Sequence, residues 1–213
     1  MENLKSKKVA LVVAHPDDET LWAGGTIMAH TEWDCFVACL CRQSDPDRAP
    51  KFYKVLESLG ATGAMANLDD GPEQKPLNEK ELDAAILKLL PEHQVDLLLS
   101  HDPGGEYTRH LRHEEIGAAV IRLWEKQLLV ASELWTFAYE DGKRSYLPKA
   151  VQGADVYFKL PVVLWEKKYH LMNELYGFHA DGWEAQTTPE TEAFRRFLNP
   201  QQAMEWLYQR KVL

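Results

Sequence analysis

Short, continuous apolar runs that alternate with amphipathic stretches constrain this chain more than any other feature. The apolar runs are 7–15, 34–42, 95–101 and 129–139. They lack the polar–apolar alternation of strands with one wet face, so we expect strands buried on both faces. The stretches that follow them are expected to be helices, over 18–31, 47–61, 78–93 and 112–127. This alternation predicts a three-layer, Rossmann-like α/β fold, in which a mostly parallel sheet has helices on both faces.

The C-terminal third, roughly 141–213, carries weaker signals. Residues 140–155 are loop-like, 155–163 fit a strand, and 162–178 fit a helix. We interpret 188–213 as a helical element followed by a final segment. No linker or internal repeat divides the sequence, so we expect a single domain over residues 1–213.

Composition narrows the class of protein. A net charge of −9 with no basic run argues against nucleic-acid binding. No signal peptide and no membrane-spanning run is evident, and three cysteines within residues 35–41 resemble buried core residues of a reducing compartment. We therefore expect a cytoplasmic protein. Aromatic tail residues such as Trp206 and Tyr208 suit a core or an interface, which leaves a homo-oligomer open.

A cluster of acids follows the first apolar run, in VVAHPDDETLWAGG. His15 ends the strand, and Asp17, Asp18 and Glu19 follow Pro16. Acids in the first turn of a helix are stabilised by its dipole, which is one explanation. It does not account for His15, or for three acids at the mouth of an apolar sheet. A divalent metal would supply the missing countercharge, and imidazole plus carboxylate suits zinc.

A second histidine pair follows the run that ends at His101. His110 and His113 are three residues apart and share one face of a helix. Ordinary surface histidines would give the same spacing. In open α/β sheets, however, ligands gather at the carboxyl ends of the strands. We therefore expect this pair to approach the acidic cluster.

AHPDDE at 14–19, followed by GEY at 105–107 and the HxxH pair, resembles the PIG-L/LmbE superfamily of zinc-dependent N-acetylglucosaminyl deacetylases. The resemblance implies that His15, Asp18 and His113 bind zinc and that Asp17 is the general base. It further implies that His110 stabilises the oxyanion or protonates the leaving amine. By the same resemblance, Tyr107 would reach the substrate carbonyl. The sequence departs from the family pattern by placing two residues, Thr108 and Arg109, between the tyrosine and the first histidine.

Loops after the other strands are expected to overhang the same site. Arg42 and Arg48 would hydrogen-bond a sugar or a phosphate, although a solvated polar loop explains them too. His101 and His179 are further candidates for substrate binding, each with an ordinary loop histidine as the alternative. The remaining aromatic candidate is Trp183, as a surface on which a sugar ring stacks.

These features predict a metal-dependent hydrolase that removes an acetyl or similar acyl group from an N-acetylglucosamine-type amino sugar or conjugate. Zinc is the expected metal, although His and Asp ligands also accept Fe²⁺, Mn²⁺ or Co²⁺. One alternative is an amidase for another small amide or thiol conjugate with the same metal site. Others are a Rossmann-like module that binds a small molecule without chemistry, and a structural or interaction protein that keeps only the scaffold.

Overall fold

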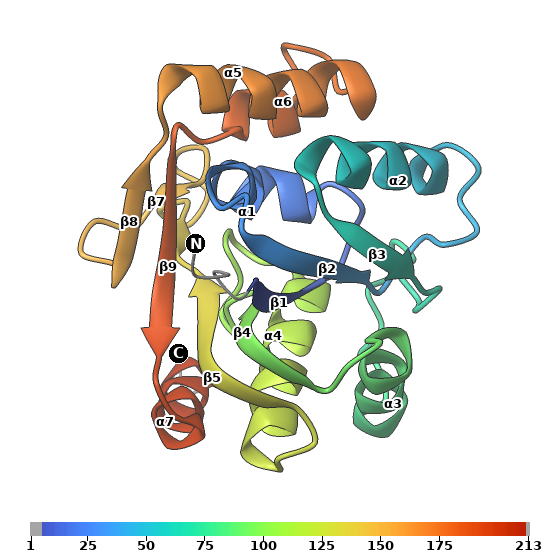
Figure 1. The fold of residues 1–213 in the computed structure, drawn as a ribbon, viewed down its shortest axis with the longest axis vertical. Coiled ribbons are helices and arrows are strands. Elements are labelled where there is room, and N and C mark those ends of the chain that lie inside the picture. The colour runs from blue at the N-terminus through green and yellow to red at the C-terminus, as the bar shows by residue number, and fades with distance from the viewer. Residues whose placement is uncertain (1–5, 212–213) are drawn as a thin grey trace, which may run out of the picture.

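A seven-stranded sheet with the order β3-β2-β1-β4-β5-β9-β8 forms the centre of the computed structural model, which describes residues 6–211 (Figure 1). The five strands on one side of this order are mutually parallel: β1 (Lys7–Val13), β2 (Trp33–Cys39), β3 (Thr62–Met65), β4 (Gln94–Ser100) and β5 (Val130–Phe137). The predicted three-layer α/β fold is therefore confirmed.

The helices divide between the two faces of the sheet (Figure 1). One face is covered by α1 (Asp18–Ala29), α2 (Arg48–Leu59), α5 (Val162–His170) with a π-helical continuation (Leu171–Leu175), and α6 (Trp183–Thr187). The other face is covered by α3 (Glu79–Leu89), α4 (Leu111–Glu125) and α7 (Pro200–Lys211). Within residues 6–211, no helix has both the length and the apolar character needed to cross a bilayer.

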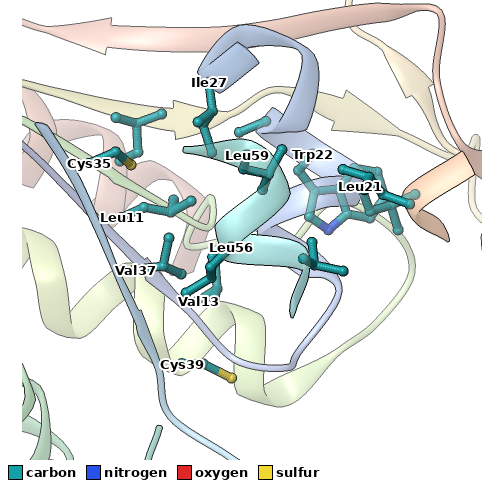
Figure 2. Close-up of a cluster of buried hydrophobic side chains, with 14 of the residues drawn as sticks. Leu11, Val13, Leu21, Trp22, Ile27, Cys35, Val37, Cys39, Leu56 and Leu59 are labelled. Atoms are coloured by element: carbon teal, nitrogen blue, oxygen red, sulfur yellow. The ribbon is translucent and has the colours of Figure 1, made fainter. Parts of the chain in front are cut away.

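Strand β1 explains why the first apolar run shows no alternation. Leu11 and Val13 face the core beneath α1 and α2, whereas Ala10 and Val12 face the core beneath α3 and α4. Figure 2 shows Leu11 and Val13 among side chains from β2, α1 and α2. Since each face of the strand meets a helical layer, every position from Val9 to Val13 is apolar and buried.

The three cysteines are free and buried, as expected. Cys35 and Cys39 belong to the core cluster shown in Figure 2. Cys41 follows the end of β2 and belongs to the opposite core, so the three thiols do not share one face of the sheet. Burial raises the pKa of the Cys35 thiol to about 12, which makes it a packing residue rather than a nucleophile.

The tail differs from its sequence interpretation. Residues Thr191–Phe197 form a strand, β9, instead of helix, and only α7 after it is helical. Strand β9 is antiparallel to β5 and to β8 (Val156–Lys159). Its burial does not alternate cleanly, because Glu192, Ala193 and Phe194 are all buried. A period of two was therefore invisible in the sequence.

The loop-like stretch 140–155 contains a small antiparallel pair of strands, β6 (Tyr139–Glu140) and β7 (Lys149–Ala150). Asp141 in this stretch accepts hydrogen bonds from the backbone N–H (2.8 Å) and the hydroxyl (2.7 Å) of Thr108. Arg144 donates to the carbonyl oxygen of Thr108 (2.7 Å). Thr108, one of the two residues between Tyr107 and His110, is thus held by a segment outside the GEY and HxxH motifs.

Candidate active site

Three side chains from two distant segments converge where β1 and β4 end. His15 Nδ1 lies 3.2 Å from His113 Nε2 and 3.2 Å from Asp18 Oδ2, and Asp18 Oδ1 lies 3.4 Å from His113 Nε2. Tetrahedral zinc with bonds of roughly 2.0–2.1 Å separates its ligand atoms by about 3.3–3.4 Å. The spacing of these donor atoms therefore suits a tetrahedral divalent metal.

The strand-to-helix corner fixes the first two of these residues. The Asp18 carboxylate accepts a hydrogen bond from the backbone N–H of His15 (2.8 Å), which folds the corner back on itself. The Glu19 carboxylate, fully buried, accepts from the backbone N–H of Asp17 (3.0 Å) and from the hydroxyl of Tyr176 (2.6 Å). Glu19 therefore holds the backbone of the corner, and Asp18 turns toward the histidines.

The orientation of the His15 ring is set by Asp70, which follows β3. His15 Nε2 lies 3.1 Å from Asp70 Oδ1, so Nε2–H donates to this carboxylate and Nδ1 faces Asp18. Burial opposes charge on His15, but Asp18 and Asp70 outweigh it and raise the pKa of the ring in the metal-free protein. A carboxylate behind a histidine is the usual support of a metal ligand.

Glu106 supports His113 in the same way. His113 Nδ1 lies 2.6 Å from Glu106 Oε2, which leaves Nε2 facing His15 and Asp18. Burial opposes the charge of Glu106, but His101 and His113 hold its pKa down, at about 2. Glu106 is therefore a carboxylate at every pH at which the protein would be assayed.

His101 differs from its expected place. It is fully buried, stacks on His113 at 3.9 Å between ring centroids, and does not line the pocket. Asp18, His101 and His113 present ligand atoms within 4.8 Å of one another. However, the backbone N–H of Ala14 donates to His101 Nε2 (3.0 Å), while Nδ1 faces Glu106 (3.1 Å). Both ring nitrogens are therefore engaged, and His101 packs behind His113 rather than touching a substrate.

Asp17 stands beside the three donors and has a different environment. Its backbone has φ 135°, in a region that L-residues rarely adopt. Burial, together with the neighbouring Asp18, raises the pKa of Asp17 well above its usual value. Arg48 Nη1 lies 3.5 Å from its carboxylate. A carboxylate with a raised pKa beside these donor atoms has the property required of a general base.

His110 and Tyr107 form the wall next to these residues. The His110 ring lies 4.2 Å from the His113 ring and 4.7 Å from that of His15, between ring centroids. Burial and the two neighbouring histidines lower the pKa of His110 to about 3. The surroundings of His110 therefore oppose the positive charge that it would need to protonate a leaving amine. Burial raises the pKa of Tyr107, so its hydroxyl stays protonated and can donate.

A pocket of about 340 Å³ opens onto this cluster. It is lined by residues of the four loops at the carboxyl edge of the sheet, by the start of α1 and by α6: His15, Pro16, Asp17, Asp18, Leu21, Trp22, Arg42, Arg48, Asp70, Pro72, Gln74, Tyr107, His110, Trp183 and Glu184. Trp183 packs edge-on against Tyr107 at 4.8 Å and lies at the rim, 37% exposed. The lining is mostly polar, with one aromatic wall.

Only some of the residues predicted to bind substrate line the pocket. Arg42 and Arg48 line the pocket, and Arg42 is paired with Asp70 through Nε (3.1 Å) and Nη2 (2.7 Å). Arg48 lies over the Phe178 ring at 4.4 Å. His179 is exposed and is not among the pocket-lining residues, so its role in substrate binding stays a prediction.

Sequence analysis missed Asp70 as the partner of His15 and left the role of Glu106 open. Both are acids that follow a strand of the parallel sheet, in LDDG and GGEY. The signal for both acids in the sequence was their position shortly after a strand, at the edge of the sheet where the site lies. Which of two adjacent aspartates, Asp69 or Asp70, would reach His15 could not be read from the sequence.

Comparison with known proteins identifies the family of this chain and solved structures that share its fold. The model of the family described as PIG-L, GlcNAc-PI de-N-acetylase, matches residues 10–124, more than half of the chain. A search of curated proteins gives no match.

Several solved structures share the fold at low identity. N,N'-diacetylchitobiose deacetylase from Pyrococcus horikoshii has 18% identity and a TM-score of 0.67, over 90% of this chain and 84% of that chain. GalB, the 4-carboxy-2-hydroxymuconate hydratase from Pseudomonas putida KT2440, has 19% identity and a TM-score of 0.58, over 85% and 83%. The zinc-inhibited form of teicoplanin deacetylase Orf2 has 13% identity and a TM-score of 0.60, over 84% of each chain.

Proposed function

The chain belongs to the PIG-L (GlcNAc-PI de-N-acetylase) family, and from this membership and the site geometry we propose that it is a zinc-dependent deacetylase of N-acetyl amino sugars or their conjugates. One observation carries the proposal. The facing donor atoms of His15, Asp18 and His113 lie 3.2–3.4 Å apart, with Asp18 presenting a different oxygen to each histidine, and the partly buried carboxylate of Asp17 stands beside them. A pocket large enough for a small molecule opens on the same point.

The donor set fits a divalent metal. Asp70 and Glu106 each orient one histidine so that the other ring nitrogen faces Asp18. His15 and His113 would bind the metal through Nδ1 and Nε2, and Asp18 through its carboxylate. A metal held there would acidify a water molecule and polarise the acyl carbonyl oxygen.

The chain's own groups account for the proton transfers. Asp17 accepts a proton from the attacking water through its carboxylate, which the raised pKa favours. The Tyr107 hydroxyl donates toward the developing oxyanion. Since His110 is neutral before reaction, it delivers a proton to the leaving nitrogen only after it has received one within the site. Acetate and a free amine are the products.

The remaining alternatives have distinct signatures. A module that only binds a small molecule does not need a carboxylate with a raised pKa, such as that of Asp17, next to a set of metal-ligand atoms. A hydratase neighbour with the same fold shows that this architecture also occurs with a different reaction. An amidase for another small amide would share the site, and only the choice of substrate separates it from an amino-sugar deacetylase.

Release of primary amine from a panel of N-acetyl amino sugars tests the proposal, with the protein loaded with one equivalent of Zn²⁺. Asp17→Asn is expected to lower kcat by about 100- to 10,000-fold and to retain metal. Asp47→Asn is the matched control, because Asp47 lies in an adjacent loop and pairs only with Lys51. Wild-type protein that binds zinc and releases no amine from any member would refute the deacetylase, and full activity of Asp17→Asn would refute the base.

A further inference from the structure

A buried carboxylate outside the active-site pocket joins the C-terminal helix α7 to the loop after β4. Asp102, 1% exposed, accepts hydrogen bonds from Trp206 Nε1 at Oδ2 (2.8 Å) and from Arg210 Nε at Oδ1 (3.0 Å). Both donors belong to α7, which lies outside residues 10–124 that the family model matches. These contacts therefore lie beyond the motifs from which the site was inferred.

Asp102 also closes the turn that leads to Glu106. Its carboxylate accepts a hydrogen bond from the backbone N–H of Gly104 (2.8 Å), and its carbonyl oxygen accepts one from that of Gly105 (2.8 Å). The backbone N–H of Asp102 donates to Glu106 Oε1 (3.0 Å), while Glu106 Oε2 faces His113 Nδ1 (2.6 Å). The place of Asp102 therefore decides where the Glu106 carboxylate lies.

The Arg210 side chain packs directly on the backbone of this turn. A Cβ atom on Gly104 would lie 2.6 Å from Arg210 Nε, closer than a real Cβ atom approaches, so glycine provides the room that Arg210 occupies. The guanidinium groups of Arg210 and Arg195 lie over the Trp206 ring, at 4.9 Å and 4.1 Å from its centroid. These cation–π contacts fix the indole whose N–H reaches Asp102.

We propose that Arg210 and Trp206 are positioning residues of the active site, which act through Asp102. By holding Asp102, they keep the Glu106 carboxylate where it orients His113. The inference rests on the proposed function, because it treats His113 as a metal ligand. A buried carboxylate that loses its cation or a hydrogen-bond donor is unfavourable in its place, so it moves toward other donors or water. Such a movement of Asp102 withdraws its N–H from Glu106 and loosens the turn.

Zinc affinity, measured by competition with a chromophoric chelator in two backgrounds, tests this inference. Arg210→Met removes the cation and donor at Asp102 and should weaken zinc binding by about 3- to 10-fold, less than a substitution of Glu106 itself. In the Glu106→Gln background it should change zinc affinity by less than about twofold, because the carboxylate through which Arg210 acts is already absent. Arg195→Met is the matched control and should stay within about twofold of wild type, because both arginines lie over the Trp206 ring but only Arg210 of the two donates to Asp102.

The two backgrounds separate positioning from a general loss of stability. An equal loss of zinc affinity in both overturns the inference, as does a zinc affinity of folded Arg210→Met equal to that of wild type. Trp206→Phe keeps an aromatic ring and removes the N–H donor, so it is the second variant if Arg210→Met does not fold, and the same pattern is expected of it. If wild type binds zinc and releases no amine, the proposed deacetylase fails, and the zinc affinities still decide the role of Arg210. If wild type binds no zinc, both proposals fail.

Discussion

Glu106→Gln is the most informative single substitution for the metal site. The Glu106 carboxylate is fully buried and receives three N–H groups: those of His113 Nδ1 (2.6 Å) and His101 Nδ1 (3.1 Å) at Oε2, and the backbone N–H of Asp102 (3.0 Å) at Oε1. Glutamine has the same shape but only one oxygen. Whichever way the amide turns, its NH₂ group faces at least one of these donors.

The expected loss of stability and of zinc affinity follows from these three hydrogen bonds. One buried donor left without a partner costs about 1–3 kcal/mol. In addition, an amide behind His113 makes Nε2 a weaker ligand than a carboxylate does. Substitutions behind metal-binding histidines typically weaken metal binding by about 10- to 100-fold, equivalent to about 1.4–2.8 kcal/mol. We expect a loss within this range for Glu106→Gln.

Zinc affinity, measured by competition with a chromophoric chelator, is the assay. Glu114→Gln is the matched control, because Glu114 lies beside His113 in α4 and its carboxylate pairs outward with Arg109. The control should stay within about twofold of wild type. Zinc affinity of folded Glu106→Gln within twofold of wild type would refute the support that we assign to Glu106.

Three further outcomes are expected. In metal-free protein the pKa values of His15 and His113 are raised, so their contribution to stability is complete below about pH 6.5 and is lost as the pH rises through the raised values. Zinc displaces these protons, so the zinc-induced rise in Tm should be larger at pH 8 than at pH 6, and an equal rise would count against these ligands. Asp141→Ala removes the two hydrogen bonds that the Asp141 carboxylate accepts from Thr108 in the loop leading into α4. It should lower kcat about tenfold with zinc affinity unchanged, whereas equal loss of both would contradict a local effect. Lys168→Met leaves the buried Glu192 carboxylate without its ion-pair partner. It should lower the free energy of unfolding by about 3–5 kcal/mol in urea titrations, and a change below 1 kcal/mol would contradict this expectation.

The parallel half of the fold was predictable because its central strands are buried on both faces. Residues 9–14 and 97–99 are all apolar and buried, since helices cover both sides of the sheet. Strand β9 was missed for the opposite reason. It joins the sheet antiparallel to β5, its side chains do not alternate, and Arg195 and Arg196 interrupt the apolar pattern. Such a strand is defined by its partner in space, which a local pattern does not contain.

For the candidate site, the sequence predicted which segments meet but not how each side chain is used. His15 and His113 were expected to converge, and their facing nitrogens lie 3.2 Å apart. His101 had equal sequence support, because it also ends a strand. Its ring nitrogens are engaged by Ala14 and Glu106, and only coordinates reveal that. The roles of these residues in metal binding stay predictions.

The strand order explains why two unrelated acids come to support two histidines. His15 follows β1, at the centre of the sheet, and His113 is reached through the loop after β4, the neighbour of β1. Glu106 belongs to that same loop, so it reaches His113 from within one connection. Asp70 follows β3, which lies beyond β2 on the other side of β1, and it approaches His15 from the opposite direction. The two supports therefore enter from both sides of the switch between β1 and β4, where open α/β sheets leave a crevice. Because each histidine is held by a separate loop, substitution of Asp70 and substitution of Glu106 should weaken metal binding through different histidines, and their free-energy effects should add when the two are combined.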